Sequence, residues 1–268
     1  MPSLDGPRDE QIPAVPNAPE IQTLTFETDA GNGREARIGL IVLQTDQTIE
    51  PEFASVFRGK GITLHHVRIR NASDVTPQTL RQMERELPEA ASLLPRRFGF
   101  NAIGYGCTSG TTMIGEARVD RIIRQAHPDA KTSNPLTACK AALSALALKR
   151  IALVTPYVPS VTAELRRNLE AAGFRTGAVA SFNQSDEFTV ARITPGSILD
   201  AVESVGARKD CDGVFVACTG LRALPVIPAG EARLGKPVVS SNQALAWHLM
   251  RLTGIDVSPE EGGQLFRT

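Results

Sequence analysis

The sequence lacks an excess of charge of either sign, and it lacks any long apolar run. Lys plus Arg and Asp plus Glu each number 29 among 268 residues, and no block of basic residues breaks this balance. We therefore expect neither nucleic acid nor membrane as a partner, because both usually require a basic surface. The longest apolar stretches, such as residues 142–148, are far shorter than the roughly 20 residues that a membrane-spanning helix needs.

The N-terminal region lacks the apolar core of a secretion signal, so we expect a cytoplasmic protein. Residues 1–36 are rich in Pro, Asp, Gly and Asn and have little apolar periodicity, which predicts a flexible arm. With 42% hydrophobic residues, the chain as a whole has ample material for a packed core.

The four cysteines lack the paired short spacings of a zinc site. They are Cys107, Cys139, Cys211 and Cys218. A chain of this length does not need disulfides to hold it together, so we expect free thiols and no metal. The glycine-containing stretches also lack a full dinucleotide fingerprint or phosphate loop, and they give no reason to expect a nucleotide.

From Arg37 onward, short β-branched runs alternate with longer stretches of helical period. This alternation predicts an α/β fold in which parallel sheets are flanked by helices. The expected strands cover residues 37–43, 62–69, 100–106, 151–156, 175–182, 212–217 and 237–241. The expected helices cover residues 51–59, 77–87, 111–126, 161–172 and 195–205, with a closing helix that ends near residue 252.

The second part of the chain repeats the first. The run RIGLIV at Arg37 aligns with RIALVT at Arg150, an offset of 113 residues. The turn glycines Gly61 and Gly173 differ by 112, and the cysteines of AIGYGCT and GVFVACT differ by 111. Features in the same order at nearly one offset indicate a duplication and therefore two pseudo-symmetric subdomains.

The duplication predicts how the chain is divided and where its site lies. We expect a first subdomain made of residues 37–136 plus 239–262, and a second made of residues 137–238. Parallel α/β sheets bind ligands beyond the carboxyl ends of their strands, and Cys107 and Cys218 both stand at such ends. Two facing halves would then direct two thiols into one cleft.

The residues after each cysteine suggest a reactive thiol. Cys107 is followed by TSG (108–110) and a predicted helix, and Cys218 is followed by TG (219–220). Backbone N–H groups and the positive end of a helix dipole would lower the thiol pKa toward neutrality. The same N–H groups can stabilise an enediolate, and two thiols on opposite faces suit removal and return of a proton at an α-carbon.

The alternative is that each cysteine is a small core residue, as free cysteines often are. We keep that interpretation for Cys139, which lies in an Ala/Leu-rich helical run, and for Cys211, which has no repeat partner. For the duplicated Cys-Thr pair, packing alone gives no reason why both halves retain the same polar cluster.

Four stretches carry a family resemblance. They are GYGCTSG, VACTGLRAL, RIGLIVLQTDQTIEPEF and LVTPYVPSV. Together they resemble the aspartate/glutamate racemase superfamily, and within it the branch of the maleate cis-trans isomerases and ectoine-utilisation proteins, over about residues 37–252. The resemblance implies two α/β subdomains with the site between them, no metal or organic cofactor, and a homo-oligomer.

The resemblance also implies roles for individual residues. Cys107 would be the nucleophile or first base, and Cys218 the opposing acid or base. Tyr157, in TPY, would bind a substrate carboxylate, and Asn183, in SFNQ, would supply a polar contact. The hydroxyl and backbone donors would be Thr108, Ser109, Thr219 and Gly220. The alternatives are a strand-end tyrosine packed on a loop and, for Asn183, a turn residue.

One position departs from the maleate isomerase pattern. Those enzymes carry an asparagine after the first strand, whereas this chain has Asp46 in QTDQT. A carboxylate there would repel a substrate carboxylate unless it is protonated, but it could bind an amino group or assist Cys107 as a base. The Asp-x-Thr form is similar to that of the ectoine-utilisation proteins. The alternative for Asp46 is a helix cap.

These features together predict a cofactor-independent, two-cysteine racemase or isomerase. It would act next to a carboxylate of a small amino acid or dicarboxylic acid, in the degradation of ectoine or hydroxyectoine. Three alternatives stay open: a maleate cis-trans isomerase, an arylmalonate-type decarboxylase, and a non-catalytic protein that binds a small acid. The decarboxylase type keeps only the second cysteine, so the presence of Cys107 speaks against it.

Overall fold

The computed structural model describes residues 21–255 and 262–268. The chain divides into two units, residues 1–31 and residues 32–268. Within the first unit, residues 21–31 are exposed and contain neither helix nor strand. Residues 1–20 of the predicted arm lie outside the described residues.

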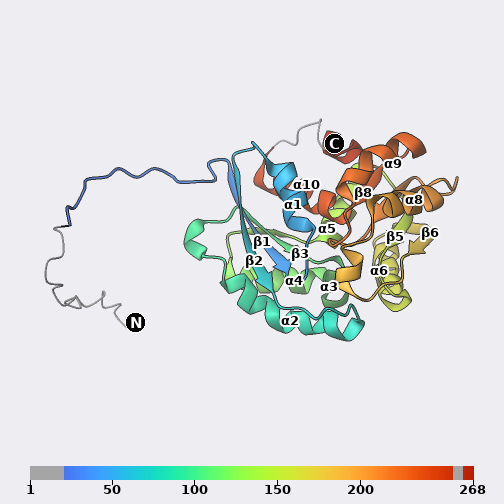
Figure 1. The fold of residues 1–268 in the computed structure, drawn as a ribbon, viewed down its shortest axis with the longest axis horizontal. Coiled ribbons are helices and arrows are strands. Elements are labelled where there is room, and N and C mark those ends of the chain that lie inside the picture. The colour runs from blue at the N-terminus through green and yellow to red at the C-terminus, as the bar shows by residue number, and fades with distance from the viewer. Residues whose placement is uncertain (1–20, 256–261) are drawn as a thin grey trace. The chain divides into compact units, whose positions relative to one another are not determined.

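The second unit contains two parallel four-stranded sheets with the same strand order, β2-β1-β3-β4 and β6-β5-β7-β8 (Figure 1). The first sheet consists of β1 (Ala36–Leu43), β2 (Ile62–Ile69), β3 (Ala102–Gly106) and β4 (Lys131–Ser133). The second consists of β5 (Arg150–Thr155), β6 (Arg175–Ser181), β7 (Gly213–Val216) and β8 (Val238–Ser240). The predicted α/β class with two similar sheets is confirmed.

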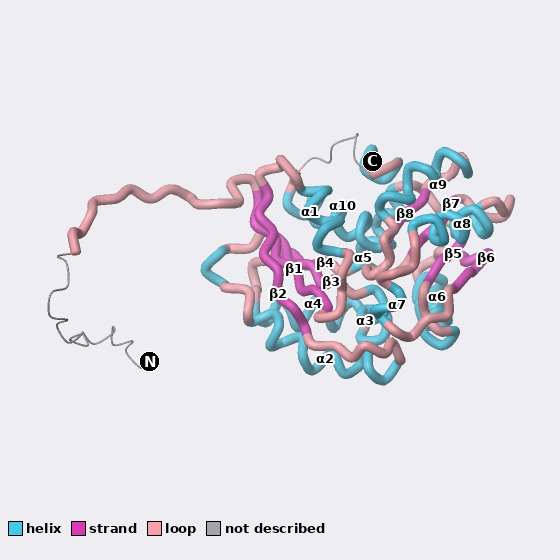
Figure 2. The backbone as a smooth tube through the Cα atoms, in the orientation of Figure 1, coloured by secondary structure: helices cyan, strands magenta, loops and turns pink. Residues whose placement is uncertain are grey.

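Helices connect and cover these strands (Figure 2). The helices associated with the first sheet are α1 (Ile49–Phe57), α2 (Pro77–Ser92), α3 (Thr108–Ile114), α4 (Glu116–Ala126) and α5 (Pro135–Ala145). Those that follow are α6 (Pro159–Ala171), α7 (Glu187–Val190), α8 (Pro195–Gly206), α9 (Ile227–Leu234) and α10 (Ser241–Thr253). Short 3-10 turns η1, η2 and η3 cover Arg96–Phe98, Leu224–Val226 and Gln264–Arg267.

The inner strands are buried because helices cover both faces of each sheet. All five residues of β3 and all four of β7 are buried, as is typical of parallel strands. No helix in the part of the chain that the structure describes combines the length and apolar character that crossing a membrane requires.

The sequence prediction omitted β4, α5 and α9, and it also differs from the structure between β3 and β4. We expected one helix over residues 111–126, but the structure has α3 and α4, separated at Gly115. Gly115 has a φ of +94°, a conformation that glycine adopts without the steric penalty of a side chain. The first helix also begins earlier than expected, at Thr108, directly after Cys107.

Helix α10 follows the second sheet but returns to the first, where it packs against β3, β4 and α5. Gly104 of β3 permits this close approach, since a Cβ there would lie only 3.0 Å from Leu249 Cδ1 of α10. The start of α10 therefore lies where the two halves meet. The predicted boundaries between the two subdomains stay a prediction. The structure separates residues 1–31 from residues 32–268 but does not divide residues 32–268 further.

Candidate active site

Cys107 directly follows β3 and caps the N-terminus of α3. Its Sγ accepts a hydrogen bond from the Gly110 amide at 3.1 Å and lies 3.6 Å from Ser109 Oγ. The backbone of Cys107 has ordinary extended geometry, and the residue is only 2% exposed. The local sequence thus places this thiol on backbone N–H groups, as the pattern predicted.

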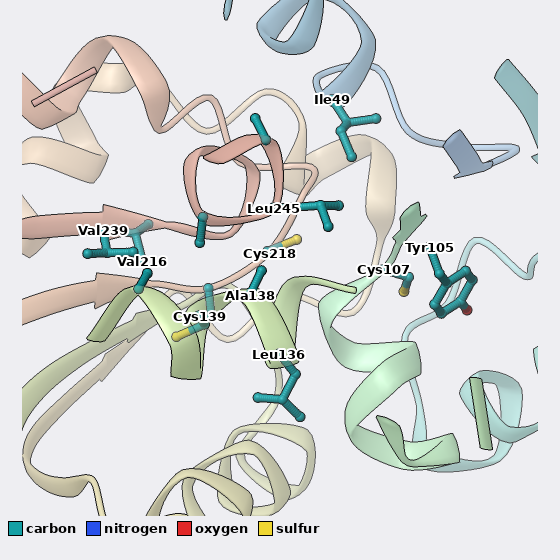
Figure 3. Packing of buried hydrophobic residues seen from close by; sticks show 14 of the residues in the cluster. Ile49, Tyr105, Cys107, Leu136, Ala138, Cys139, Val216, Cys218, Val239 and Leu245 are labelled. Atoms are coloured by element: carbon teal, nitrogen blue, oxygen red, sulfur yellow. The ribbon is translucent and has the colours of Figure 1, made fainter. Parts of the chain in front are cut away.

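Cys218 follows β7 at the corresponding place in the second half, but its conformation differs. Its φ is +114°, which is rare for any residue with a side chain and is a source of backbone strain. Its Sγ accepts from the Gly220 amide at 3.3 Å, and the residue is 5% exposed. Figure 3 shows the Cys218 sulfur turned toward the side on which Cys107 lies, whereas the Cys139 sulfur points away.

Hydrogen bonds join the segments that carry the two cysteines. Ser241 Oγ, at the start of α10, accepts from the Cys218 amide at 3.0 Å and from Thr108 Oγ1 at 2.8 Å. Thr219 Oγ1 donates to the Gly106 carbonyl at 3.3 Å. In this structure the hydroxyl groups of both threonines therefore connect the halves, and their predicted contacts with substrate stay predictions.

Tyr157 lies in the same buried region. It is 1% exposed, and its hydroxyl has no hydrogen-bond partner within the described residues. Burial raises the pKa of this hydroxyl well above its usual value, and the nearby thiols of Cys218 and Cys107 raise it further. Tyr157 is therefore a protonated donor beside both cysteines, and its hydroxyl lies close enough to the Cys218 thiol to interact with it.

Asp46 takes the capping role that the sequence left as the alternative, and its predicted contact with substrate stays a prediction. Oδ1 accepts from the amides of Thr48 and Ile49 at 2.7 and 2.8 Å and so caps α1. Oδ2 is buried and has no partner in the described part of the chain. Burial raises the pKa of Asp46 although these amide bonds oppose it. One oxygen is structural, and the other remains free.

Asn183 stands apart from this group. It is exposed, its φ is +52°, and its amide donates to Ser181 Oγ at 3.0 Å. These are features of a turn residue, the alternative that the sequence left open.

Glu187 was not predicted from the sequence. It opens α7 and is only 7% exposed. A Cβ at Gly220 would lie 3.6 Å from Glu187 Oε2 and 3.6 Å from Cys218 Sγ, so carboxylate and thiol flank the same small region. Burial raises the pKa of Glu187 to about 7, and repulsion from Asp46 adds to the effect. Nothing in the sequence around Glu187 indicates that this glutamate is buried.

The segment that carries Glu187 is attached to the first half through its backbone. The Val75 amide donates to the Ser185 carbonyl at 2.7 Å, and the Glu187 amide donates to the Ser73 carbonyl at 3.1 Å. An isolated bridge pairs Asp74 with Asp186 between them. We call this pairing of residues 73–75 with 185–187 the inter-half pairing.

The expected lowering of the thiol pKa values is wrong for this structure. Burial raises the pKa of Cys107 to about 12 and that of Cys218 well above its usual value. The charge of Glu187 adds to both shifts, and the backbone N–H groups oppose them without compensating. Loss of solvation outweighs the amides here, so both residues rest as neutral thiols.

Neither thiol is open to bulk solvent. A cavity of about 560 Å³ lies between α1 and the loop after β7, but neither cysteine lines it. A much smaller cavity, about 10 Å³, reaches Glu187 beside Asp74 and Val75. Across residues 21–255 and 262–268, no group of three or more His, Cys, Asp and Glu side chains is placed to hold a metal ion.

Comparison with known proteins shows the family to which the chain belongs. The family model described as arylmalonate decarboxylase matches residues 38–266. The arylmalonate decarboxylase of Bordetella bronchiseptica is 35% identical over 132 residues, which cover 48% of this chain and 55% of that protein. The maleate isomerase of Nocardia farcinica is 26% identical over 245 residues, covering 86% and 95% of the two chains.

Solved structures show the same fold. Maleate isomerase from Pseudomonas putida, in a structure with maleate, superposes with a TM-score of 0.80 at 23% identity, covering 86% of this chain and 97% of that one. A Nocardia farcinica maleate cis-trans isomerase mutant with a covalently bound succinylcysteine intermediate superposes with a TM-score of 0.77 at 26% identity, covering 87% and 98%.

Two matching parallel sheets, each with a cysteine after its third strand in the chain, define an α/β protein of the aspartate/glutamate racemase-like fold. Within that class the chain belongs to the arylmalonate decarboxylase family, whose model covers most of its length. The relatives named above are enzymes of two kinds, isomerases and a decarboxylase.

Proposed function

We propose that this chain is a cofactor-independent isomerase in which Cys107 and Cys218 act as a pair on the carbon next to a carboxylate of a small amino acid. One observation carries the proposal: each half supplies a buried thiol from the same strand end, and Ser241 joins the two segments. Two groups that exchange protons on opposite faces of a planar carbanion can racemise an α-carbon.

The raised thiol pKa values require a base that takes the first proton. Glu187, whose pKa lies at about 7, is suited to accept a proton near neutral pH. One thiol transfers its proton to Glu187, and the resulting thiolate removes the α-proton of the substrate. The opposite thiol then donates its proton to the other face of the enediolate. Glu187 returns its proton to the thiolate left behind, so the charges and protons balance.

Groups on both halves are placed to assist this transfer. The amides of Gly110 and Gly220 already donate to the two sulfur atoms and would stabilise each thiolate as it forms. The hydroxyl of Tyr157, which has no partner in the described residues, is available to donate to a substrate carboxylate.

The charges around the thiols favour an amino acid over a dicarboxylate as substrate. Asp46 presents a buried oxygen without a partner in the described residues, and Glu187 adds a second carboxylate close enough to interact with it. In their ionised forms these two groups repel a doubly negative ligand and complement a protonated amine. The finer proposal, an amino acid from ectoine or hydroxyectoine degradation, comes from the sequence resemblance, and none of the named relatives carries that activity.

Maleate isomerisation is the second candidate, because the similarity to maleate isomerases extends over most of the chain. Cys107 would add to the double bond, the resulting single bond would rotate, and elimination would release the product. Glu187 also leaves this route open, since a carboxyl group with a pKa of about 7 can be protonated and donate to a carboxylate.

Incubation in deuterated water tests the proposal. We would follow aspartate, diaminobutyrate derivatives, maleate and an arylmalonate by NMR, with wild-type protein and the Cys107→Ala and Cys218→Ala variants. We expect deuterium at the α-carbon of an amino acid together with racemisation in wild type, and no racemisation with either variant. Conversion of maleate to fumarate without amino acid exchange would select the second candidate, and carbon dioxide release from an arylmalonate would contradict both.

A further inference from the structure

The loop that carries Cys218 belongs to the second half in sequence, but groups packed on the first half hold much of it. Thr48, just before α1, donates to the Gly220 carbonyl at 2.8 Å. Asn242 of α10 donates through Nδ2 to the Thr219 carbonyl at 2.9 Å. This support matters because Cys218 has a strained φ, and such conformations persist only where the surroundings impose them.

Glu52 of α1 connects these contacts. Its Oε2 accepts from Asn242 Nδ2 at 2.7 Å, and its Oε1 accepts from the Leu224 amide at 3.0 Å. The same Asn242 nitrogen therefore bridges the Glu52 carboxylate and the carbonyl next to Cys218. The Glu52 carboxylate thus binds the Leu224 end of the loop directly, and it binds the Thr219 end through the Asn242 side chain.

We propose that Glu52 is a positioning residue for Cys218: through Asn242 and Leu224 its carboxylate fixes the loop of residues 218–224 and keeps the thiol in its strained orientation. The group touches neither thiol, so it acts only through the loop. It lines the cavity of about 560 Å³ between α1 and this loop, which neither cysteine lines.

The hydrogen-bond pattern favours an ionised carboxylate. Both partners of Glu52 are N–H donors, so both of its oxygens accept. A glutamine amide presents an NH2 group to one of these donors and can keep only one of the two bonds, and protonation of Glu52 places a hydrogen on one oxygen and weakens the bond that this oxygen accepts. Glu52→Gln is therefore nearly isosteric but breaks the connection at one end.

The charged surroundings of Glu52 bring this change into an accessible pH range. The pKa of Glu52 is raised to about 7, mainly by burial, and the charge of Asp46 ahead of α1 contributes to this shift. Arg222 of the loop lines the same cavity, while the α10 partner, Asn242, is neutral. The loop should therefore be held fully above about pH 7 and loosen as Glu52 takes up a proton below it.

The test measures thiol reactivity and needs no substrate, so its outcome is independent of the proposed reaction. Folded protein is treated with methyl methanethiosulfonate from pH 5.5 to 8.5, and modification of Cys218 and Cys107 is followed in the same sample by peptide mass spectrometry. Loss of a hydrogen bond to a charged group should raise the ratio of Cys218 to Cys107 modification about tenfold in Glu52→Gln at pH 8. Wild type should approach the ratio of this variant as the pH falls below about 7.

Two further variants make the result decisive. Asn242→Ala should raise the ratio to a similar extent, and the double variant should add little, because both changes break the same connection. Glu231→Gln is the matched control: this half-buried carboxylate also accepts backbone amides, from Val238 and Gln264, but it is not bonded to residues 218–224. A ratio within about twofold of wild type in both Glu52→Gln and Asn242→Ala, or an equal rise in Glu231→Gln, would overturn the proposal.

Discussion

The two halves place a cysteine at the same strand end but support it in different ways. Cys107 has relaxed backbone geometry and caps a helix of its own half. Cys218 has a φ of +114°, and the next regular element begins only at Leu224. Its loop is held instead by Thr48, Glu52 and α10. Duplication preserved the position of the thiol, whereas the means of fixing it diverged.

The two halves of the chain are therefore not independent of each other. Ser241 accepts from the amide of Cys218 and from the hydroxyl of Thr108, so one oxygen contributes to both thiol-bearing segments. A change in the segment next to Cys107, such as at Thr108, is therefore expected to affect Cys218 as well.

Loss of either thiol should give the largest effect. If both cysteines transfer protons, Cys107→Ala and Cys218→Ala should each lower kcat by about 10³-fold, within the range expected for a general acid or base. Steady-state kinetics on the substrate found in deuterated water would measure this. A loss confined to one of the two variants would break the functional symmetry of the pair.

The glycines that follow the two thiols differ in the space around them. A Cβ at Gly110 would lie 2.6 Å from Met83 Cε, 2.7 Å from Tyr105 Oη and 2.9 Å from Cys107 Sγ. At Gly220 the nearest atoms are 3.6 Å away. Gly110→Ala should therefore lower the free energy of unfolding by about 3 kcal/mol, through overpacking, and Gly220→Ala by less than about 1 kcal/mol. Urea denaturation of the two variants measures the difference, and equal losses would contradict it.

The pH dependence of stability tests the burial of Glu187, whose charge raises the pKa of both thiols. Its pKa is about 7 in the folded chain against 4.5 for an ordinary glutamate, so the folded state binds this proton more tightly. The resulting stability is fully present below about pH 4.5 and is lost as the pH rises toward 7. Between pH 5 and 8, wild type should lose on the order of 2 kcal/mol more than Glu187→Gln.

Urea midpoints of the two proteins at several pH values provide the measurement. Parallel curves for wild type and Glu187→Gln would show that this carboxyl group is solvated in solution. Since Glu52 titrates in the same range and is present in both proteins, its contribution cancels in the difference.

Asn183→Ala should give the smallest effect. The side chain is exposed and lies outside the buried group around the thiols, so kcat/KM should change by less than about twofold. A loss of tenfold or more would mean that this turn moves toward the thiols when substrate binds, and it would support the role that the sequence resemblance implied.

Much of the architecture could be predicted from the chain because parallel strands leave a strong signal. The buried runs at β1 and β5, and the repeat that aligns Cys107 with Cys218, gave the two sheets and the strand ends. The break at Gly115 was missed because a glycine within a helical pattern does not reveal whether the chain continues through it. Strand β4 has only three residues, too few for any periodicity.

The electrostatics of the site could not be predicted in the same way. The pKa of a thiol depends on how much solvent it loses, and that is decided by distant segments such as the one carrying Glu187. The sequence around Cys107 shows the amides that lower its pKa but not the burial that raises it. Burial of Glu187 likewise follows from the pairing of residues 73–75 with 185–187, which no local pattern encodes.

The inter-half pairing of residues 73–75 with 185–187 has a kinetic consequence. Both sulfur atoms are almost completely buried, so a ligand can reach them only if part of the chain moves, and this short backbone pairing lies beside the small cavity that reaches Glu187. If the pairing must separate for the proposed reaction, its opening rate sets an upper limit on turnover, whatever the intrinsic speed of proton transfer. Solvent viscosity would slow such an enzyme, and water would be kept from the carbanion between openings.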